Sequence, residues 1–399
     1  MTKDRVPFIA LALLITVPYL LFTPTLLFPI RRVVAVEVHV VVCLLVLLGI
    51  VAATIAGVLL AATSATPLKP AFQCGGTVAT EPLLHVFIIG MLAVSIFTHL
   101  SLVLVGGYAY IGGGFLAARE AFIFKGVGIL LRLYMFALPL AVLMFPGRLA
   151  LIRVAIMLGV LVILRAFLLS ERMAMLEFLA TVWVVMRLVG YSPPVGLAVK
   201  VAICVLGLYG FIEWLRIGLQ GSLDNSLYET GSGSPINNIF IYYADTANKF
   251  YKVVFEGFAY EYPFWNLLFR ELTGTAASTD AAGSEVFDGL VRSDPDFIRA
   301  LNNTGGLAQD FSDFGLYVGP LVVLLKFSLA AFAIRRARTS PIWLAVCPAF
   351  VTAILEYPRF NYLYLPYAAI VAILGLAVGL WASFAIRRNI DRVAYACCD

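Results

Sequence analysis

The sequence has few charged residues and few cysteines, and it lacks the short motifs that bind metals or nucleotides. Only 13% of its 399 residues are charged, whereas 62% are hydrophobic. Six cysteines are scattered along the chain without a CxxC pair, and no HExxH motif occurs, so a protein-bound metal is not expected. The phosphate-binding GxxxxGK[ST] loop is also missing, so direct use of ATP is not indicated and no cofactor is expected.

Apolar stretches of 18 or more residues recur along most of the chain, which is typical of a polytopic helical membrane protein. The ten-residue alternation of an outer-membrane barrel is not present. The predicted fold is therefore an all-α polytopic membrane protein with about ten transmembrane helices. The predicted spans cover residues 7–29, 33–62, 82–110, 127–145, 149–168, 173–189, 195–218, 315–334, 341–357 and 364–386.

One long polar segment, residues 219–314, interrupts the series of spans. It divides the chain into a membrane part at 1–218, a large loop at 219–314 and a second membrane part at 315–399. The loop holds thirteen of the 23 acidic residues and only five of the 28 basic ones. Loops of this length are uncommon unless they are functional, so we expect the chemistry of the protein beside this segment.

Basic residues in the short connections predict the orientation in the membrane. They follow the eighth and the tenth predicted spans, at Arg335, Arg336, Arg338, Arg387, Arg388 and Arg392. These two places are expected on the cytoplasmic side. With ten spans, both termini are then cytoplasmic and the large loop is external.

Arginines at predicted outer ends of spans are candidates for phosphate binding. Arg165 and Arg172 are seven residues apart, so in a continuous helix they would share one face about two turns apart. Two planar guanidiniums at this spacing would grip a pyrophosphate. The alternative is that Glu171 and Glu177 neutralise them as structural ion pairs.

The loop contains an aromatic block between Asn237 and Arg270 with twelve Phe, Tyr or Trp residues. Its first half has apolar residues at helical spacing, which predicts an amphipathic helix on the outer leaflet. Most of these rings serve packing or interfacial anchoring in the simpler interpretation. The candidates for contact with sugar are Tyr242, Tyr243, Tyr251 and Asp245.

The loop ends in a polar, glycine-containing segment that precedes the eighth span. Arg299 leads into the segment from Asn302 to Gly315, which includes Asp310 and Asp313. We expect its glycine-rich turn to place the two carboxylates at the start of that span.

Three sequence elements together resemble the O-antigen polymerase family of oligosaccharide repeat-unit polymerases. The first is Ser170-x-Arg172 with Leu176 four residues on. The second is Tyr242-Tyr243-x-Asp245. The third is Asn-x₃-Gly-Leu-x₅-Asp-Phe-Gly-x₃-Gly from Asn302 to Gly319. The arrangement covers about two-thirds of the chain.

The resemblance implies a metal-independent membrane glycosyltransferase with a GT-C-like architecture. Such an enzyme transfers a growing glycan from undecaprenyl pyrophosphate to another lipid-linked repeat unit, at the outer face of the bacterial inner membrane. Its partners would be that lipid-linked oligosaccharide, membrane lipid, and a chain-length regulator and flippase of the same pathway, with no nucleic acid. Arg172 and Asp313 match the family motifs, whereas Arg165 and Arg359 match by placement only.

The residues proposed for the reaction are accordingly of two kinds. The catalytic candidates are Arg172, Asp313, Asp310 and Asp245. The substrate-binding candidates are Arg165, Arg359, Tyr242, Tyr243, Tyr251, Asn302 and Arg299. The alternatives are a ligase-like or polyprenyl-phosphate-dependent glycosyltransferase, a transporter of lipid-linked sugars and, less favoured, a structural membrane partner. A transporter more often has internal repeats, and no clear repeat is present.

Overall fold

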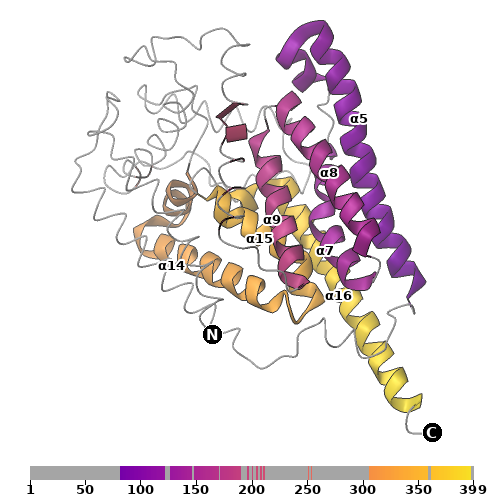
Figure 1. Cartoon of the computed structure of the whole chain (residues 1–399). Coiled ribbons are helices and arrows are strands. Elements are labelled where there is room, and N and C mark those ends of the chain that lie inside the picture. The colour runs from indigo at the N-terminus through magenta and orange to yellow at the C-terminus, as the bar shows by residue number, and fades with distance from the viewer. Residues whose placement is uncertain are drawn as a thin grey trace. The chain divides into compact units, whose positions relative to one another are not determined.

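The computed structural model describes residues 81–121, 126–145, 148–169, 171–189, 305–357 and 361–396, together with single positions 196, 200, 204, 207, 208, 210, 211, 250 and 253 (Figure 1). This described part is helical and contains no strand. Five of its helices are long and apolar enough to cross a membrane: Pro82–Gly114, Val127–Met144, Leu149–Leu169, Gly306–Arg336 and Tyr367–Arg388. The predicted class, an all-helical protein with membrane-spanning helices, is confirmed for the described residues, and the number of ten spans stays a prediction. The predicted spans at 7–29 and 33–62, and most of 195–218, lie outside the described residues.

The chain divides into two compact units that alternate along the sequence. Unit 1 comprises residues 1–60, 221–331 and 353–369, and unit 2 comprises 61–220, 332–352 and 370–399. Three helices have residues in both units, namely α14 (Gly306–Arg336), α15 (Pro341–Glu356) and α16 (Pro366–Ala396).

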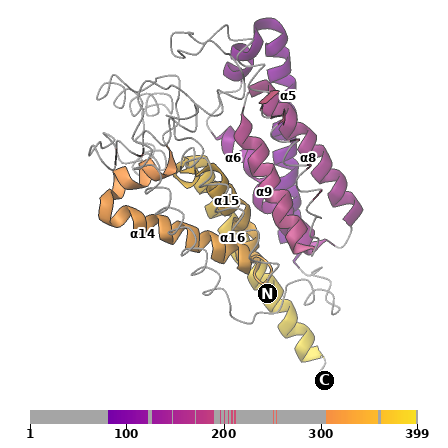
Figure 2. The same cartoon turned by 60° about the vertical axis from the view of Figure 1, so that its left-hand side comes forward.

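Five of the described helices lie entirely within unit 2. They are α5 (Pro82–Glu120), α6 (Val127–Arg132), α7 (Tyr134–Met144), α8 (Arg148–Leu169) and α9 (Arg172–Leu188). Helix α5 packs on α7 and α8, and α9 packs on the same two helices, so that they lie side by side in Figures 1 and 2. The predicted span at 82–110 continues to residue 120 across a break at Gly114, where φ is 73°.

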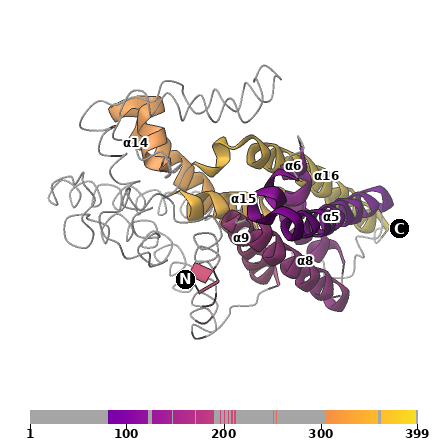
Figure 3. The ribbon, with the colours of Figure 1, turned by 90° about the horizontal axis from the view of Figure 1, so that it is seen from above.

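The apolar residues of unit 2 show which helices are inside. Helix α7 is buried on almost every side, whereas α5 has a stripe of exposed apolar side chains at helical spacing, including Val86, Phe97, Leu104 and Ile111. Viewed from above, α5, α6, α8 and α9 gather in one group (Figure 3). An apolar stripe on the outside of such a group is the surface that a lipid bilayer covers.

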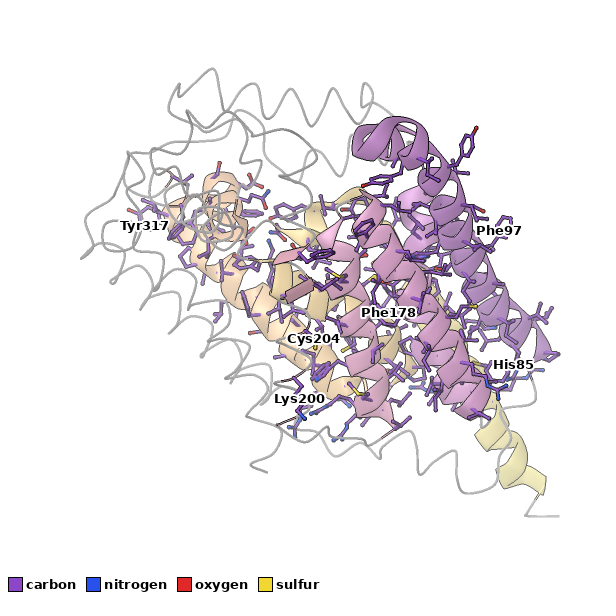
Figure 4. All side chains as sticks on the ribbon, turned by 45° about the horizontal axis from the view of Figure 1, so that its top comes forward. His85, Phe97, Phe178, Lys200, Cys204 and Tyr317 are labelled. Carbon is purple, nitrogen blue, oxygen red and sulfur yellow. The ribbon has the colours of Figure 1, made fainter. Side chains whose placement is uncertain are left out.

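A glycine permits close packing between α8 and α9. A Cβ added at Gly159 would lie 3.0 Å from the ring of Phe178, which projects from α9 (Figure 4). Small residues let neighbouring membrane helices approach closely.

Helix α14 begins nine residues before the span predicted at 315–334. The residues before Gly315 are helical, Gly315 itself has φ 71° and ψ 178°, and a second helical segment follows, so that α14 bends sharply (Figure 2). Asp310 and Asp313 therefore lie within a helix and not in a turn. Because this first segment is polar, hydropathy alone placed the start of the predicted span at Gly315.

The glycines of the 302–319 motif have separate structural roles within unit 1. The Gly306 amide donates to the Tyr357 carbonyl oxygen over 2.9 Å, and a Cβ at Gly306 would lie only 2.6 Å from that oxygen. Gly319 lies against Phe311, 3.2 Å from where its own Cβ would be. Gly315 has open space around it and is required for its left-handed backbone.

Substitution of Gly315 tests whether the bend depends on backbone conformation alone. We expect Gly315→Ala to lower the free energy of unfolding by about 1–2 kcal/mol, because a Cβ disfavours positive φ. The matched control is Gly90→Ala in α5, which also has open space around it but an ordinary helical backbone. That change should be neutral or stabilise by about 0.5–1 kcal/mol. Denaturant unfolding in detergent measures both, and equal effects of the two changes would contradict a conformational requirement at Gly315.

Candidate functional site

A buried carboxylate organises the polar cluster of unit 1. Asp310 has no exposed surface. Its Oδ1 accepts hydrogen bonds from Lys326 Nζ at 2.5 Å, from Asn361 Nδ2 at 2.8 Å and from the Tyr364 hydroxyl at 2.9 Å. Its Oδ2 accepts from the Tyr357 hydroxyl at 2.8 Å. We call these five residues the Asp310 cluster.

The cluster exists because α14 bends. Asp310 and Lys326 are sixteen residues apart, which in a straight helix would separate them by about 24 Å along the axis. The break at Gly315 lets the short first segment of α14 lie so that Asp310 reaches Lys326 on the second segment.

Residues beyond α15 complete the cluster and anchor its backbone. Tyr357 follows the last residue of α15, and Tyr364 ends the short 3-10 helix η3 (Tyr362–Tyr364). The backbone amide of Asn361 donates to the side-chain oxygen of Gln309, the neighbour of Asp310. The chain segment before α16 is thus tied to the start of α14 by side-chain and backbone groups.

Tyr364 links the carboxylate and the ammonium. Its hydroxyl donates to Asp310 and accepts from Lys326 Nζ at 3.1 Å, and Lys326 Nζ also lies 4.2 Å from the centre of the Tyr364 ring. Burial, together with the negative charge of Asp310 and the hydrogen bond to it, raises the pKa of Tyr364 well above 10. Tyr364 therefore stays a neutral donor at physiological pH.

Sequence reasoning missed Lys326, Tyr357, Asn361 and Tyr364. A signal for Lys326 was present, because it is the single charged residue between 315 and 334. Ionisable residues within membrane spans are costly and mark functional or paired positions. No comparable signal marks Tyr357, Asn361 or Tyr364, since their role depends on how the chain folds back onto α14.

A second polar cluster lies among α5, α6, α8 and α9 in unit 2. Arg132 donates to Glu177 at 2.5 Å and to Glu171 at 2.8 Å. Arg165 donates to both carboxylate oxygens of Glu171, with distances of 2.6–2.9 Å. The two guanidiniums are only 2% and 1% exposed. We call these four residues the arginine cluster.

His99 of α5 joins the arginine cluster. Its Nδ1 lies 2.9 Å from the Ser95 carbonyl oxygen, and its Nε2 lies 3.4 Å from Arg165 Nη1. A carbonyl oxygen only accepts and a guanidinium only donates. The hydrogen-bond partners therefore assign the proton to Nδ1 and leave Nε2 as the acceptor.

Glu171 is ionised over the whole physiological range. Burial alone would raise its pKa, but the charges of Arg165 and Arg132 and their hydrogen bonds outweigh burial and lower the pKa to about 2. A depressed carboxylate pKa means that these ion pairs contribute fully above the ordinary value near pH 4.5, and that the contribution is lost only as pH falls towards 2.

The helix that would have carried Arg165 and Arg172 on one face is not continuous. Helix α8 ends at Leu169, α9 begins at Arg172, and Glu171 between them has φ −94° and ψ 79°. The arrangement predicted for a continuous helix is therefore absent. Arg165 instead has the contacts of the structural alternative, because Glu171 neutralises it, while Glu177 pairs with Arg132.

The structure places only some of the predicted site residues. Asp310 and Asp313 lie on the first segment of α14, where Asp310 is buried and Asp313 half-buried. Arg165 belongs to the arginine cluster of the other unit, and the backbone of Arg172 begins α9. Outside the described residues lie Asp245, Tyr242, Tyr243, Tyr251, Asn302, Arg299 and Arg359. Among the described side chains, no group of three His, Cys, Asp or Glu residues is arranged to hold a metal ion.

Comparisons with known proteins return no relative: no family model, no curated protein and no solved structure matches the chain. The resemblance to repeat-unit polymerases therefore rests on the three sequence elements alone.

Charge balance in the arginine cluster distinguishes a structural Arg165 from a substrate-binding one. Arg165→Met leaves the cluster with one excess negative charge, and Glu171→Gln leaves one excess positive charge. Each should cost about 3–5 kcal/mol, as for a broken buried ion pair. The double variant keeps the Arg132–Glu177 pair and is neutral, so we expect its unfolding temperature to exceed that of either single variant.

The matched control for this cycle is Arg153→Met, at an exposed position of the same helix. It should unfold like the wild type. If Arg165→Met also unfolds like the wild type, or if the two single effects simply add in the double variant, Arg165 is not a structural partner of Glu171.

Proposed function

We propose that the protein is a membrane glycosyltransferase that polymerises oligosaccharide repeat units. It would transfer a growing glycan from undecaprenyl pyrophosphate to an incoming lipid-linked oligosaccharide, at the outer face of a bacterial inner membrane. Both termini would be cytoplasmic. The observation that carries the proposal is the Asp310 cluster, a carboxylate and an ammonium held together where the large polar segment meets an apolar span.

The topology of the helices supports an external position for this cluster. Asp310 precedes the apolar part of α14, while Arg335 and Arg336 are in its last turn. Tyr357, Asn361 and Tyr364 lie between α15 and α16. If the basic end of α14 is cytoplasmic, all these polar residues belong to the external ends of their helices. That is the side on which lipid-linked glycans are polymerised in the family that the motifs resemble.

The proposed reaction needs a cation and a proton acceptor but no metal. The acceptor hydroxyl oxygen forms a bond to the anomeric carbon, the bond from that carbon to the diphosphate oxygen breaks, and the hydroxyl proton passes to a carboxylate. Fixed cations stabilise the negative charge that develops on the departing diphosphate. The diphosphate would be bound by Arg172, Arg299 and Arg359. The proton would be accepted by Asp313 or Asp245.

The remaining predicted residues would hold the glycan. Tyr242, Tyr243 and Tyr251 offer ring faces for sugars, and Asn302 offers an amide for hydroxyl groups. A chain-length regulator and a flippase of the same pathway would be the protein partners.

Deletion of the gene tests the function. A polymerase should leave acceptor molecules that bear a single repeat unit, because elongation is lost while earlier and later steps continue. Gel analysis of lipid-linked glycans and surface polysaccharide measures this. Polymer stranded on the polyprenyl carrier would instead identify a ligase, and single units trapped on the cytoplasmic face a transporter. An unchanged ladder, in a strain without a second such enzyme, contradicts all three assignments.

Substitution of Arg172 tests the diphosphate contact. Arg172→Ala should abolish polymer while the protein stays in the membrane at its normal level, because the substrate loses a bidentate partner. Arg172→Lys should restore polymer only in part, since an ammonium lacks the planar pair of donors. Arg153→Ala is the matched exposed control. Normal glycan length in both Arg172 variants would exclude the role.

A further inference from the structure

The Asp310 cluster is asymmetric in its exposure and in its free hydrogen-bonding capacity. Asp310 is completely buried, whereas the side chain of Lys326 is 22% exposed. A carboxylate has about four acceptor positions, and Asp310 receives four hydrogen bonds. Three of these bonds go to Oδ1 and one to Oδ2. Because Asp310 is completely buried, its carboxylate is not accessible to a substrate hydroxyl.

Lys326 has more hydrogen-bond donors than the cluster uses. An ammonium group has three N–H donors, of which Asp310 and Tyr364 use two. Within the described part of the chain no further contact of Lys326 occurs beyond these two and the Tyr364 ring below it. One N–H donor of Lys326 is thus left over by the described residues.

The pair therefore presents its positive end outwards. The carboxylate is completely buried while the lysine side chain is partly exposed, so a ligand that reaches the pair would contact Lys326 before Asp310. A cation at an apolar span is costly unless it is paired or has a function, and lysine is a common point-charge ligand for phosphate. Asp313 also acts electrostatically on Lys326, so its negative charge would disfavour a phosphate bound there.

We infer that Lys326 is a direct contact for a phosphate group of a prenyl-linked substrate, and that Asp310 is the positioning residue that orients it. This inference rests on the proposed function for the identity of the substrate. It changes the role expected for Asp310, which holds the lysine and does not accept the proton of the reaction.

Binding of prenyl compounds to the full-length protein in nanodiscs tests the contact. The ligands are geranylgeranyl diphosphate and geranylgeraniol, which share one apolar chain and differ in phosphate. Lys326→Gln should weaken diphosphate binding by about ten-fold or more, as expected for a lost charged hydrogen bond, and leave geranylgeraniol binding unchanged. Lys200→Gln, at an exposed position outside the cluster, should bind both ligands like the wild type.

A charge-balanced variant guards against loss of folding. Lys326→Gln leaves Asp310 buried without its cation, whereas Lys326→Gln with Asp310→Asn has no net change in charge. The double variant should recover the wild-type unfolding temperature but not the affinity for diphosphate. Asp313→Asn should strengthen diphosphate binding, because it removes a competing negative charge. A purely structural pair predicts neither result.

Chemical modification provides a readout in the wild-type chain. Geranylgeranyl diphosphate should slow acylation of Lys326, followed by mass spectrometry, while geranylgeraniol should not, and Lys200 serves as the internal reference. The inference is overturned if the double variant binds the diphosphate with wild-type affinity. It is also overturned if Lys326→Gln lowers the affinity for both ligands equally. The binding result and the deletion result can also differ. If diphosphate binding depends on Lys326 but deletion of the gene leaves the glycan ladder unchanged, the phosphate contact stands and the polymerase function is rejected.

Discussion

The cost of placing a charge within an apolar helix is the constraint on which the described structure depends. Helices α6, α8 and α14 are mainly apolar, and each contains a buried or partly buried basic residue, at Arg132, Arg165 and Lys326. Each of these residues is paired with a carboxylate that comes from another helical segment or from a helix end. Removing two charges from water is repaid only when their geometry is good and their remaining hydrogen bonds are satisfied. Tyrosine, asparagine, histidine and backbone groups supply further hydrogen bonds in both clusters.

Breaks in the helices are the means by which these carboxylates reach their cations. Glu171 lies in the break between α8 and α9. In one continuous helix, Glu171 and Arg165 would not share a face. Asp310 reaches Lys326 because Gly315 interrupts α14. A residue with a Cβ resists positive φ, so the glycine of the Asp-Phe-Gly element has a physical reason that is separate from catalysis. The backbone conformation of Gly315 is thus what allows the ion pair between Asp310 and Lys326 to form.

Hydropathy predicted the membrane helices better than it predicted the polar clusters. The ends of α8, α9 and α15 agree with the predicted spans to within one residue, because a helix in lipid must satisfy its backbone within one apolar segment. The start of α14 was missed because its first segment is polar and is held by a contact between Gly306 and Tyr357. The partner of Arg132 lies 45 residues away at Glu177, and no periodicity encodes a pairing of that range. Asp310 is one of the candidates that the sequence motif singles out, but its four donors depend on tertiary folding.

The two clusters contain similar chemical groups but differ in what they offer a ligand. In the arginine cluster both guanidiniums are almost completely buried, and Glu171 stays ionised because its two arginines lower its pKa. A phosphate would have to displace a carboxylate that is already well bound there. In the Asp310 cluster the carboxylate is buried with four donors while the side chain of Lys326 is partly exposed, so the phosphate that we infer there would add to the pair without breaking it. Accessible hydrogen-bonding capacity, and not the number of charges, is therefore the better guide to which cluster would contact a substrate.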